Sequence, residues 1–383
     1  MIIEDSDKPM GLYVHIPFCS KKCDYCDFVS YSMDRKAQQL YLEALFTEID
    51  LVKRDYQDRV FDSLYIGGGT PSIVYEGFIA SLSRKIFSSF HFLENTEFTI
   101  EINPSSFTRE KFFEYAESGV NRISVGVQCL DSKLLANHGR LQSVENVHET
   151  FSILKDSKFI NVNGDVIIGL PGQSDESILQ TIKYLIDHNV KHISAYNLQI
   201  EKYTMLYDKI VKGRIKPIKD EKLQAINEKI YNLLSKYGFK RYEISNFAKP
   251  CFESRHNKKY WNGTNYLGLG VSAHSYVDNY RFYNTKRLDT YIDAMRDGKS
   301  AMYKREYITK ETRRTERIML SLRTSDGLDL NAFKEDFDED LLISKAKQLK
   351  NLKELKMIEV EDGFLKILPD FFNLSNSIIV ELL

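Results

Sequence analysis

Two hydrophobic patterns alternate along the first two hundred residues of the chain. Short runs of β-branched and aromatic residues are typical of strands, and longer charged runs with apolar residues at helical spacing are typical of helices. Residues 36–53 show the helical pattern through Leu42, Leu45 and Ile49. The predicted strands are 12–16, 63–66, 97–102, 122–127, 163–168 and 192–197. Six strands that alternate with helices predict a parallel sheet, either doubly wound or curved into an incomplete barrel.

The pattern changes in the second half of the chain. The predicted elements there are a helix at 220–238, an irregular aromatic-rich segment at 242–276, helices at 311–322 and 340–352, and an alternating run at 357–367. Asp362-Gly363 lies inside that run and predicts a hairpin turn. Helices followed by a hairpin predict a small winged-helix-like module. It has no marked basic helix, so packing or partner binding is favoured over DNA binding.

Polar motifs follow the first three predicted strands. A cysteine loop follows the first, the run from Gly67 to Pro71 follows the second, and Asn103-Pro104 follows the third. Ligands bind at the carboxyl ends of strands in barrels and in open α/β sheets. The positions of these motifs therefore predict one shared site.

Composition narrows the functional classes. The chain has 383 residues, of which 43% are hydrophobic, and a net charge of −1, so a large core is expected and bulk attraction to nucleic acid is not. The N-terminus is acidic without an apolar signal region, and no apolar run approaches the roughly 20 residues of a membrane span. We expect a cytoplasmic protein without a nucleic-acid partner.

Three of the five cysteines, Cys19, Cys23 and Cys26, lie within eight residues. Thiolates are soft ligands that select iron–sulfur clusters, zinc or copper(I). Three of them can bind three irons of a cubane and leave the fourth iron open to a ligand, whereas four would give a closed electron carrier. The C-x3-C-x2-C spacing therefore favours a [4Fe–4S] cluster with an open iron.

Zinc binding and disulfide formation are two further possible roles for these cysteines. Structural zinc could use His15 as a fourth ligand, although zinc sites usually take C-x-x-C pairs from two separated turns and no second pair exists. A disulfide framework does not suit a long chain with an odd number of cysteines and no secretory segment. A zinc-containing binding protein without redox chemistry thus remains an alternative.

The cysteine loop, with Tyr25 just before its last cysteine, resembles that of the radical S-adenosylmethionine superfamily. The preceding residues 13–18 resemble, more narrowly, its coproporphyrinogen III dehydrogenase-like branch. The resemblance implies a partial, TIM-like (βα)6 barrel with a C-terminal α+β region. The expected parts are a core barrel at 1–240, a connecting segment at 241–308 and a winged-helix-like domain at 309–383. S-adenosylmethionine is implied at the open iron.

The resemblance also implies a set of cofactor-binding residues. Glycines let backbone groups approach a ligand closely, an arginine can pair with the methionyl carboxylate, and acidic residues can accept from amino or ribose groups. The implied S-adenosylmethionine-binding residues are Tyr13, Tyr25, Gly68, Gly69, Thr70, Glu101, Gln128, Arg140 and Asp165.

Further motifs resemble the heme chaperone family HemW. They lie at 242–248, 255–261, 266–270 and 374–377. Phe28 stands where the related oxidative decarboxylase has another cysteine, and the segment before Tyr13 is shorter than in that enzyme. The resemblance implies a protein that binds heme and passes it to respiratory acceptors at the membrane. The alternative is a radical oxidoreductase acting on coproporphyrinogen III or a related tetrapyrrole, so enzyme status stays open.

His256 is a candidate heme ligand. Neutral imidazole is a common axial ligand of heme iron, and the adjacent Tyr260 and Trp261 could stack on a flat macrocycle. The alternative is a histidine that is hydrogen-bonded within an aromatic core. Members of the family can dimerise, and the sequence leaves the oligomeric state open.

Overall fold

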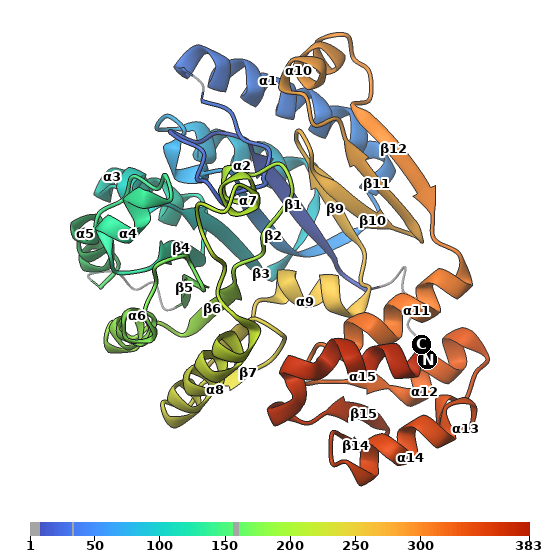
Figure 1. Ribbon diagram of the computed structural model, residues 1–383. Coiled ribbons are helices and arrows are strands. Elements are labelled where there is room, and N and C mark those ends of the chain that lie inside the picture. The colour runs from blue at the N-terminus through green and yellow to red at the C-terminus, as the bar shows by residue number, and fades with distance from the viewer. Residues whose placement is uncertain (1–7, 33, 156–160) are drawn as a thin grey trace.

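Six parallel strands form the centre of the molecule, and each contains one predicted strand. The computed structural model describes residues 8–32, 34–155 and 161–383. The strands are β1 (Met10–Ile16), β2 (Val60–Gly68), β3 (His91–Ile102), β4 (Arg122–Gln128), β5 (Asn161–Ile168) and β6 (His192–Asn197). They pair in sequence order and curve as a partial barrel in Figure 1. The expected incomplete (βα)6 barrel is therefore confirmed.

Helices cover the outer face of this sheet (Figure 1). They are α1 (Arg35–Val52), α2 (Phe78–Ser89), α3 (Arg109–Glu117), α4 (Ser132–Asn137), α5 (Val144–Lys155), α6 (Asp175–Asp187) and α8 (Asp220–Lys236). The short helix α7 (Met205–Val211) instead packs on the cysteine loop, where the Leu206 N–H donates to the Asp24 carbonyl at 2.8 Å. The helix α1 begins after Asp34 because that side chain accepts a hydrogen bond from the Ala37 N–H at 2.9 Å. Among the described residues, no helix is long and apolar enough to cross a lipid bilayer.

The central sheet continues beyond β1 and β6. The added elements are β7 (Lys240–Arg241), β8 (Asn246–Ala248), α9 (Arg255–Asn262), β9 (Tyr266–Leu269), β10 (His274–Val277), β11 (Tyr280–Asn284), α10 (Leu288–Arg296) and β12 (Met302–Tyr307). The strand order is β12-β11-β10-β9-β1-β2-β3-β4-β5-β6-β8-β7. The segment at 242–276, expected to be irregular, therefore contains strands and a helix. The boundary expected near residue 240 falls within one sheet and one hydrophobic core.

The C-terminal residues have a hydrophobic core of their own, from Ile318 to Leu382. The elements are α11 (Lys310–Ser321), β13 (Leu328–Asp329), α12 (Leu330–Phe337), α13 (Leu341–Ser344), α14 (Ala346–Glu354), β14 (Ile358–Glu361), β15 (Phe364–Ile367) and α15 (Ser375–Leu382). The predicted hairpin joins β14 to β15. Its turn residues Asp362 and Gly363 have φ of 52° and 84°, as a two-residue type I′ turn requires. The single helix predicted at 340–352 is divided into α13 and α14.

A buried carboxylate connects α1 to the added strands. Glu48 accepts from the Gly270 N–H at 2.7 Å, the Asn284 amide at 2.5 Å and the Tyr291 hydroxyl at 2.7 Å. Burial raises the pKa of Glu48 above its ordinary range. Tyr41, on the same helix, donates to the His15 carbonyl at 2.7 Å. These contacts fix the position of β1, which leads into the cysteine loop.

Replacing Glu48 with alanine is expected to destabilise this connection. Three buried donors would lose their acceptor, so we expect the free energy of unfolding to fall by about 2–4 kcal/mol. Urea denaturation followed by circular dichroism measures the change. Glu43→Ala, an exposed position on the same helix, is the control and should change stability by no more than about 0.5 kcal/mol. Equal effects of the two substitutions would contradict the structural role of Glu48.

Candidate functional site

A cavity of about 530 Å³ lies at the carboxyl ends of the barrel strands. Its size is within the usual range for small-molecule sites. It is bordered by the cysteine loop, the glycine loop after β2 and the ends of β3 to β6. It brings together all but two of the predicted site residues, namely Cys19, Cys23, Tyr25, Cys26, Gly68, Gly69, Thr70, Glu101, Gln128, Arg140 and Asp165.

Backbone hydrogen bonds shape the cysteine loop. The Cys19 N–H donates to the Tyr31 carbonyl at 3.0 Å, and the Cys26 N–H donates to the Cys23 carbonyl at 3.1 Å. The Cys19 Sγ lies 3.4 Å from the Thr70 hydroxyl. Burial raises the pKa of Cys19, and burial with the nearby Cys23 and Cys19 raises the pKa of Cys26 to about 11. Coordination to a metal deprotonates a thiol, so bound iron would convert these side chains to thiolates.

His15 is not positioned as a fourth ligand for zinc. Its Nδ1 lies 3.0 Å from the Tyr13 hydroxyl, and its Nε2 lies 3.2 Å from the Val29 carbonyl oxygen. In the described part of the chain, no three His, Cys, Asp or Glu side chains are arranged to hold a single metal ion. The three cysteines around one cavity fit the donor set of an iron–sulfur cluster with an open iron.

The glycine loop is constrained by contacts within the protein. A Cβ at Gly67 would lie 2.9 Å from the Glu101 carboxylate, and one at Gly69 would lie 2.7 Å from the Phe18 carbonyl oxygen. Gly68 has a φ of +114°, and a Cβ there would lie 2.6 Å from the His15 ring. Glycine is therefore required for the loop to pack between β3 and the cysteine loop, where it forms part of the cavity wall.

Two half-buried carboxylates face the cavity. Glu101 accepts from the Tyr65 hydroxyl at 2.8 Å and from the Gly68 N–H at 3.0 Å. Asp165 accepts from the Asn163 amide at 2.8 Å and the Ser124 hydroxyl at 3.0 Å. Burial, assisted by the negative charge of Asp165, raises the pKa of Glu101 to about 7, and burial also raises the pKa of Asp165. Both side chains can accept hydrogen bonds from a cationic or hydroxylated ligand.

Arg140 supplies a fixed positive charge to the same cavity. Its Nη2 donates to the Gly126 carbonyl at 2.6 Å, and its Nε donates to the Gln142 side chain at 2.7 Å. Gly126 leaves room for this guanidinium, because a Cβ there would lie 2.8 Å from Nη2. Gln128, at the end of β4, has a φ of +63°, an uncommon backbone conformation that recurs at functional sites.

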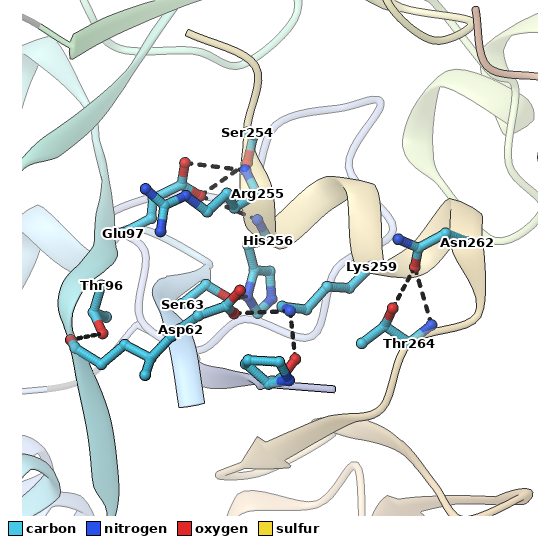
Figure 2. Close-up of polar contacts among 12 residues, drawn as sticks. Asp62, Ser63, Thr96, Glu97, Ser254, Arg255, His256, Lys259, Asn262 and Thr264 are labelled. Atoms are coloured by element: carbon cyan, nitrogen blue, oxygen red, sulfur yellow. Dashed lines mark hydrogen bonds and ion pairs between the residues drawn. The ribbon is translucent and has the colours of Figure 1, made fainter. Parts of the chain in front are cut away.

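Tyr13 and His256 are the two predicted site residues that lie outside the cavity wall. Tyr13 is inside the barrel, where its hydroxyl contacts His15. His256 is only 1% exposed, on α9 near the beginnings of β2 and β3 (Figure 2). Its Nδ1 lies 3.0 Å from the Ser63 hydroxyl and its Nε2 lies 2.8 Å from the Tyr260 hydroxyl. Because both nitrogens are engaged, this geometry favours the alternative of a histidine hydrogen-bonded within an aromatic core.

Several residues of the site were not identified from the sequence. Tyr65, Ser124 and Tyr196 lie on the cavity wall, and the Asn163 side-chain amide donates a hydrogen bond to Asp165. Alternation along the predicted strands could have identified the first three, because positions two apart face the same side of a sheet. Asp24, inside the cysteine loop, pairs with Lys209 of α7, and nothing in the sequence signals this long-range contact.

Comparisons with known proteins agree with this geometry. The radical SAM superfamily matches residues 13–185, and the HemN C-terminal domain matches residues 308–369. The structure of coproporphyrinogen III oxidase (HemN) from Escherichia coli has the same fold, with a TM-score of 0.83 and 24% identity over 98% of this chain and 90% of that one. The fold, the cysteine loop and the cavity define a radical S-adenosylmethionine superfamily protein.

Curated relatives narrow the assignment. The heme chaperone HemW of Lactococcus lactis is 30% identical over 97% of this chain and 96% of its own length. The corresponding proteins of Buchnera aphidicola and Bacillus subtilis are 33% and 32% identical, over 95% and 90% of this chain and 94% and 92% of their own lengths. The chain belongs to the HemW family.

The cysteine loop provides a direct test of cluster binding. Cys23→Ala removes one of three thiolates, so we expect iron and sulfide after anaerobic reconstitution to fall to background. The thermal unfolding midpoint of the metal-free protein should change little, because Cys23 lies on the cavity wall outside the hydrophobic core. Cys251→Ala, at an exposed thiol, is the matched control and should retain the cluster. Zinc without iron in the reconstituted wild type would contradict the cluster assignment.

The raised pKa of Glu101 gives a pH-dependent prediction. Between its ordinary value of 4.5 and about 7, the folded protein holds a proton that the unfolded chain has lost. Glu101 therefore makes the free energy of unfolding fall as the pH rises through this range. We expect Glu101→Gln to lose this contribution, so that its stability relative to wild type is greater at pH 8 than at pH 5 by about 1–3 kcal/mol. Urea denaturation at both pH values measures it, and parallel pH profiles would contradict it.

Proposed function

We propose that this protein is a heme chaperone that binds heme and transfers it to heme-accepting respiratory proteins. The observation that carries the proposal is the cysteine loop, which opens onto a ligand-sized cavity in a chain of the HemW family. Several relatives that match over most of their length are named heme chaperones. The proposed chaperone acts in the cytoplasm and meets the membrane only through its acceptor.

Cys19, Cys23 and Cys26 would hold three irons of a [4Fe–4S] cluster, and S-adenosylmethionine would bind at the fourth. When bound, this pair supplies one-electron redox chemistry. Arg140 would pair with the methionyl carboxylate, because it borders the cavity and the nearby Tyr25 and Cys23 raise its pKa against the lowering effect of burial. Glu101 and Asp165 would accept hydrogen bonds from the amino and ribose groups. The residues of the cavity thus bind and orient the cofactor.

The nature of the cavity mouth supports transfer of an apolar cargo. Phe28 and Leu141 both border the cavity and are 59% and 60% exposed. Exposed apolar side chains next to a ligand cavity are typical of binding surfaces for apolar partners. An oxidoreductase of coproporphyrinogen III remains the second candidate because the fold is shared with HemN.

Heme titration tests the proposed function. The Soret band of the cluster-loaded protein should increase to saturation as heme is added under anaerobic conditions. Mixing the heme-loaded protein with the apo form of a heme-containing respiratory protein should then transfer the Soret band to the acceptor on separation by size. Absence of saturable heme binding would reject the chaperone assignment.

An enzymatic assay separates the second candidate. The cluster-loaded protein is incubated with a reductant, S-adenosylmethionine and coproporphyrinogen III, and the tetrapyrroles are analysed by chromatography. We expect no decarboxylated product beyond a single turnover. Decarboxylated product over many turnovers would identify the protein as an oxidoreductase.

A further inference from the structure

The helix α9 closes the barrel at the end opposite the cavity. Figure 2 shows it beside Ser63 of β2 and Glu97 of β3, with His256 and Lys259 pointing toward these strands. It also packs against the beginning of β1, where Gly11 leaves the necessary space. A Cβ at Gly11 would lie 2.9 Å from the Lys259 side chain and 3.0 Å from the His256 Nδ1.

The first turn and the middle of α9 are fixed to the barrel by charged groups. Glu97 of β3 accepts from the N–H groups of Arg255 and His256 at 3.0 and 3.1 Å and lies 3.3 Å from the Ser254 hydroxyl (Figure 2). A carboxylate in this place complements the positive end of the helix dipole. Farther along the helix, Lys259 forms a 2.8 Å ion pair with Asp62. The contacts with Glu97 hold the backbone of His256, and the Lys259 ion pair adds stability farther along the helix.

The His256 ring supports the cavity wall through Tyr65. The two ring centroids are 5.2 Å apart with an interplanar angle of 31°. The Tyr65 hydroxyl in turn donates to Glu101 at 2.8 Å, and Glu101 accepts from the glycine loop. Burial lowers the pKa of His256 to about 3, with further lowering by Lys259 and Arg122, so the ring stays neutral at physiological pH. A neutral, hydrogen-bonded ring gives Tyr65 a fixed surface to pack on.

A second set of contacts leads from the start of α9 to Asp165. The Ser254 N–H donates to the Tyr242 hydroxyl at 3.4 Å, which lies 2.8 Å from the His192 Nε2. The His192 Nδ1 lies 2.7 Å from the side-chain oxygen of Asn163, whose amide donates to Asp165. The bonds are mutually consistent when neutral His192 donates from Nδ1 and accepts at Nε2. Contacts at the beginning of α9 therefore reach both carboxylates of the cavity.

We propose that α9 is a positioning element for the S-adenosylmethionine site, in which the His256 ring supports Tyr65 and thereby fixes Glu101. The proposal rests on the proposed cofactor site. It gives His256 a role in cofactor binding from the far end of the barrel, without contact with the cofactor or with heme iron.

Cofactor affinity of the full-length, cluster-loaded protein tests this role. His256→Ala is expected to weaken S-adenosylmethionine binding about tenfold. A loss of this size is typical when a residue that orients a ligand-binding side chain is removed. Anaerobic calorimetry measures the Kd, and iron analysis verifies equal cluster content. Tyr65→Phe, which removes only the hydroxyl bound to Glu101, should give a similar loss. The double variant should lose little more than either single one, because both act on the same contact.

Three further variants separate positioning from a purely structural role. Lys259→Met breaks the ion pair on the same helix without touching Tyr65, so it should lower the thermal midpoint and change the Kd less than twofold. His256→Phe keeps an aromatic ring against Tyr65 and should retain most of the affinity. His256→Gln keeps polar atoms without a ring and should bind as weakly as His256→Ala. If His256→Ala does not fold, His256→Gln takes its place as the test of the positioning role.

The outcomes distinguish this proposal from the function it rests on. If the wild type does not bind S-adenosylmethionine, the cofactor site itself is rejected. If the wild type binds it, an unchanged Kd in a folded His256 variant beside a weakened Tyr65→Phe would overturn the positioning role. Loss of heme binding in His256→Ala at an unchanged Kd would likewise overturn it, in favour of direct heme ligation.

Discussion

The interior of the barrel is polar, and the rest of the structure follows from the need to satisfy these buried groups. Strands β4 to β6 direct Ser124, Asn163, Asp165, His192 and Ser194 inward, and their neighbours on the other face join the hydrophobic core beneath the helices. Burying a polar group without a partner costs roughly 1–3 kcal/mol, so each one restricts the positions of several others. The result is a connected network in which a carboxylate at the cavity depends on residues two or three strands away.

This division of the two sheet faces separates stability from ligand binding. The apolar side chains between strands and helices form one core from Met10 to Ala301, which does not depend on what the cavity contains. The inner face can therefore contain carboxylates with raised pKa values. A well-packed apolar interior would exclude such carboxylates. The closure of the lower end by α9 keeps these groups away from water on one side and leaves the cavity as their route to solvent.

The sequence predicted the parts of the molecule whose signals are local. The six central strands were identifiable because their β-branched runs are short and bounded by turns, and the cysteine and glycine motifs directly follow two of them. The added strands β9 to β11 were missed because aromatic and Asn residues obscure their alternation. A turn signal was present between β10 and β11, where Asp278 and Asn279 both have positive φ.

The positions of Tyr13 and His256 depended on long-range packing. The resemblance implied a cofactor-binding role for Tyr13, but β1 continues for three more residues, to Ile16, before the cysteine loop begins. His256 belongs to a motif of aromatic and cationic residues that, as a pattern, suits either a macrocycle or a protein core. The packing of α9 beneath the barrel, where Gly11 allows close approach, determines that protein side chains surround His256.

Electrostatics explain why such a cavity suits the proposed cofactor. Glu101, Asp165 and three cysteines face it, and Arg140 on its wall is held in the charged form by the nearby Tyr25 and Cys23, against the opposing effect of burial. Burial raises the pKa values of both carboxylates, and with a pKa of about 7 Glu101 is only partly ionised at neutral pH. A positively charged ligand lowers the pKa of a neighbouring carboxylate and favours its ionised form. Binding of a sulfonium compound would therefore favour the ionised state of these carboxylates, which the protein alone disfavours.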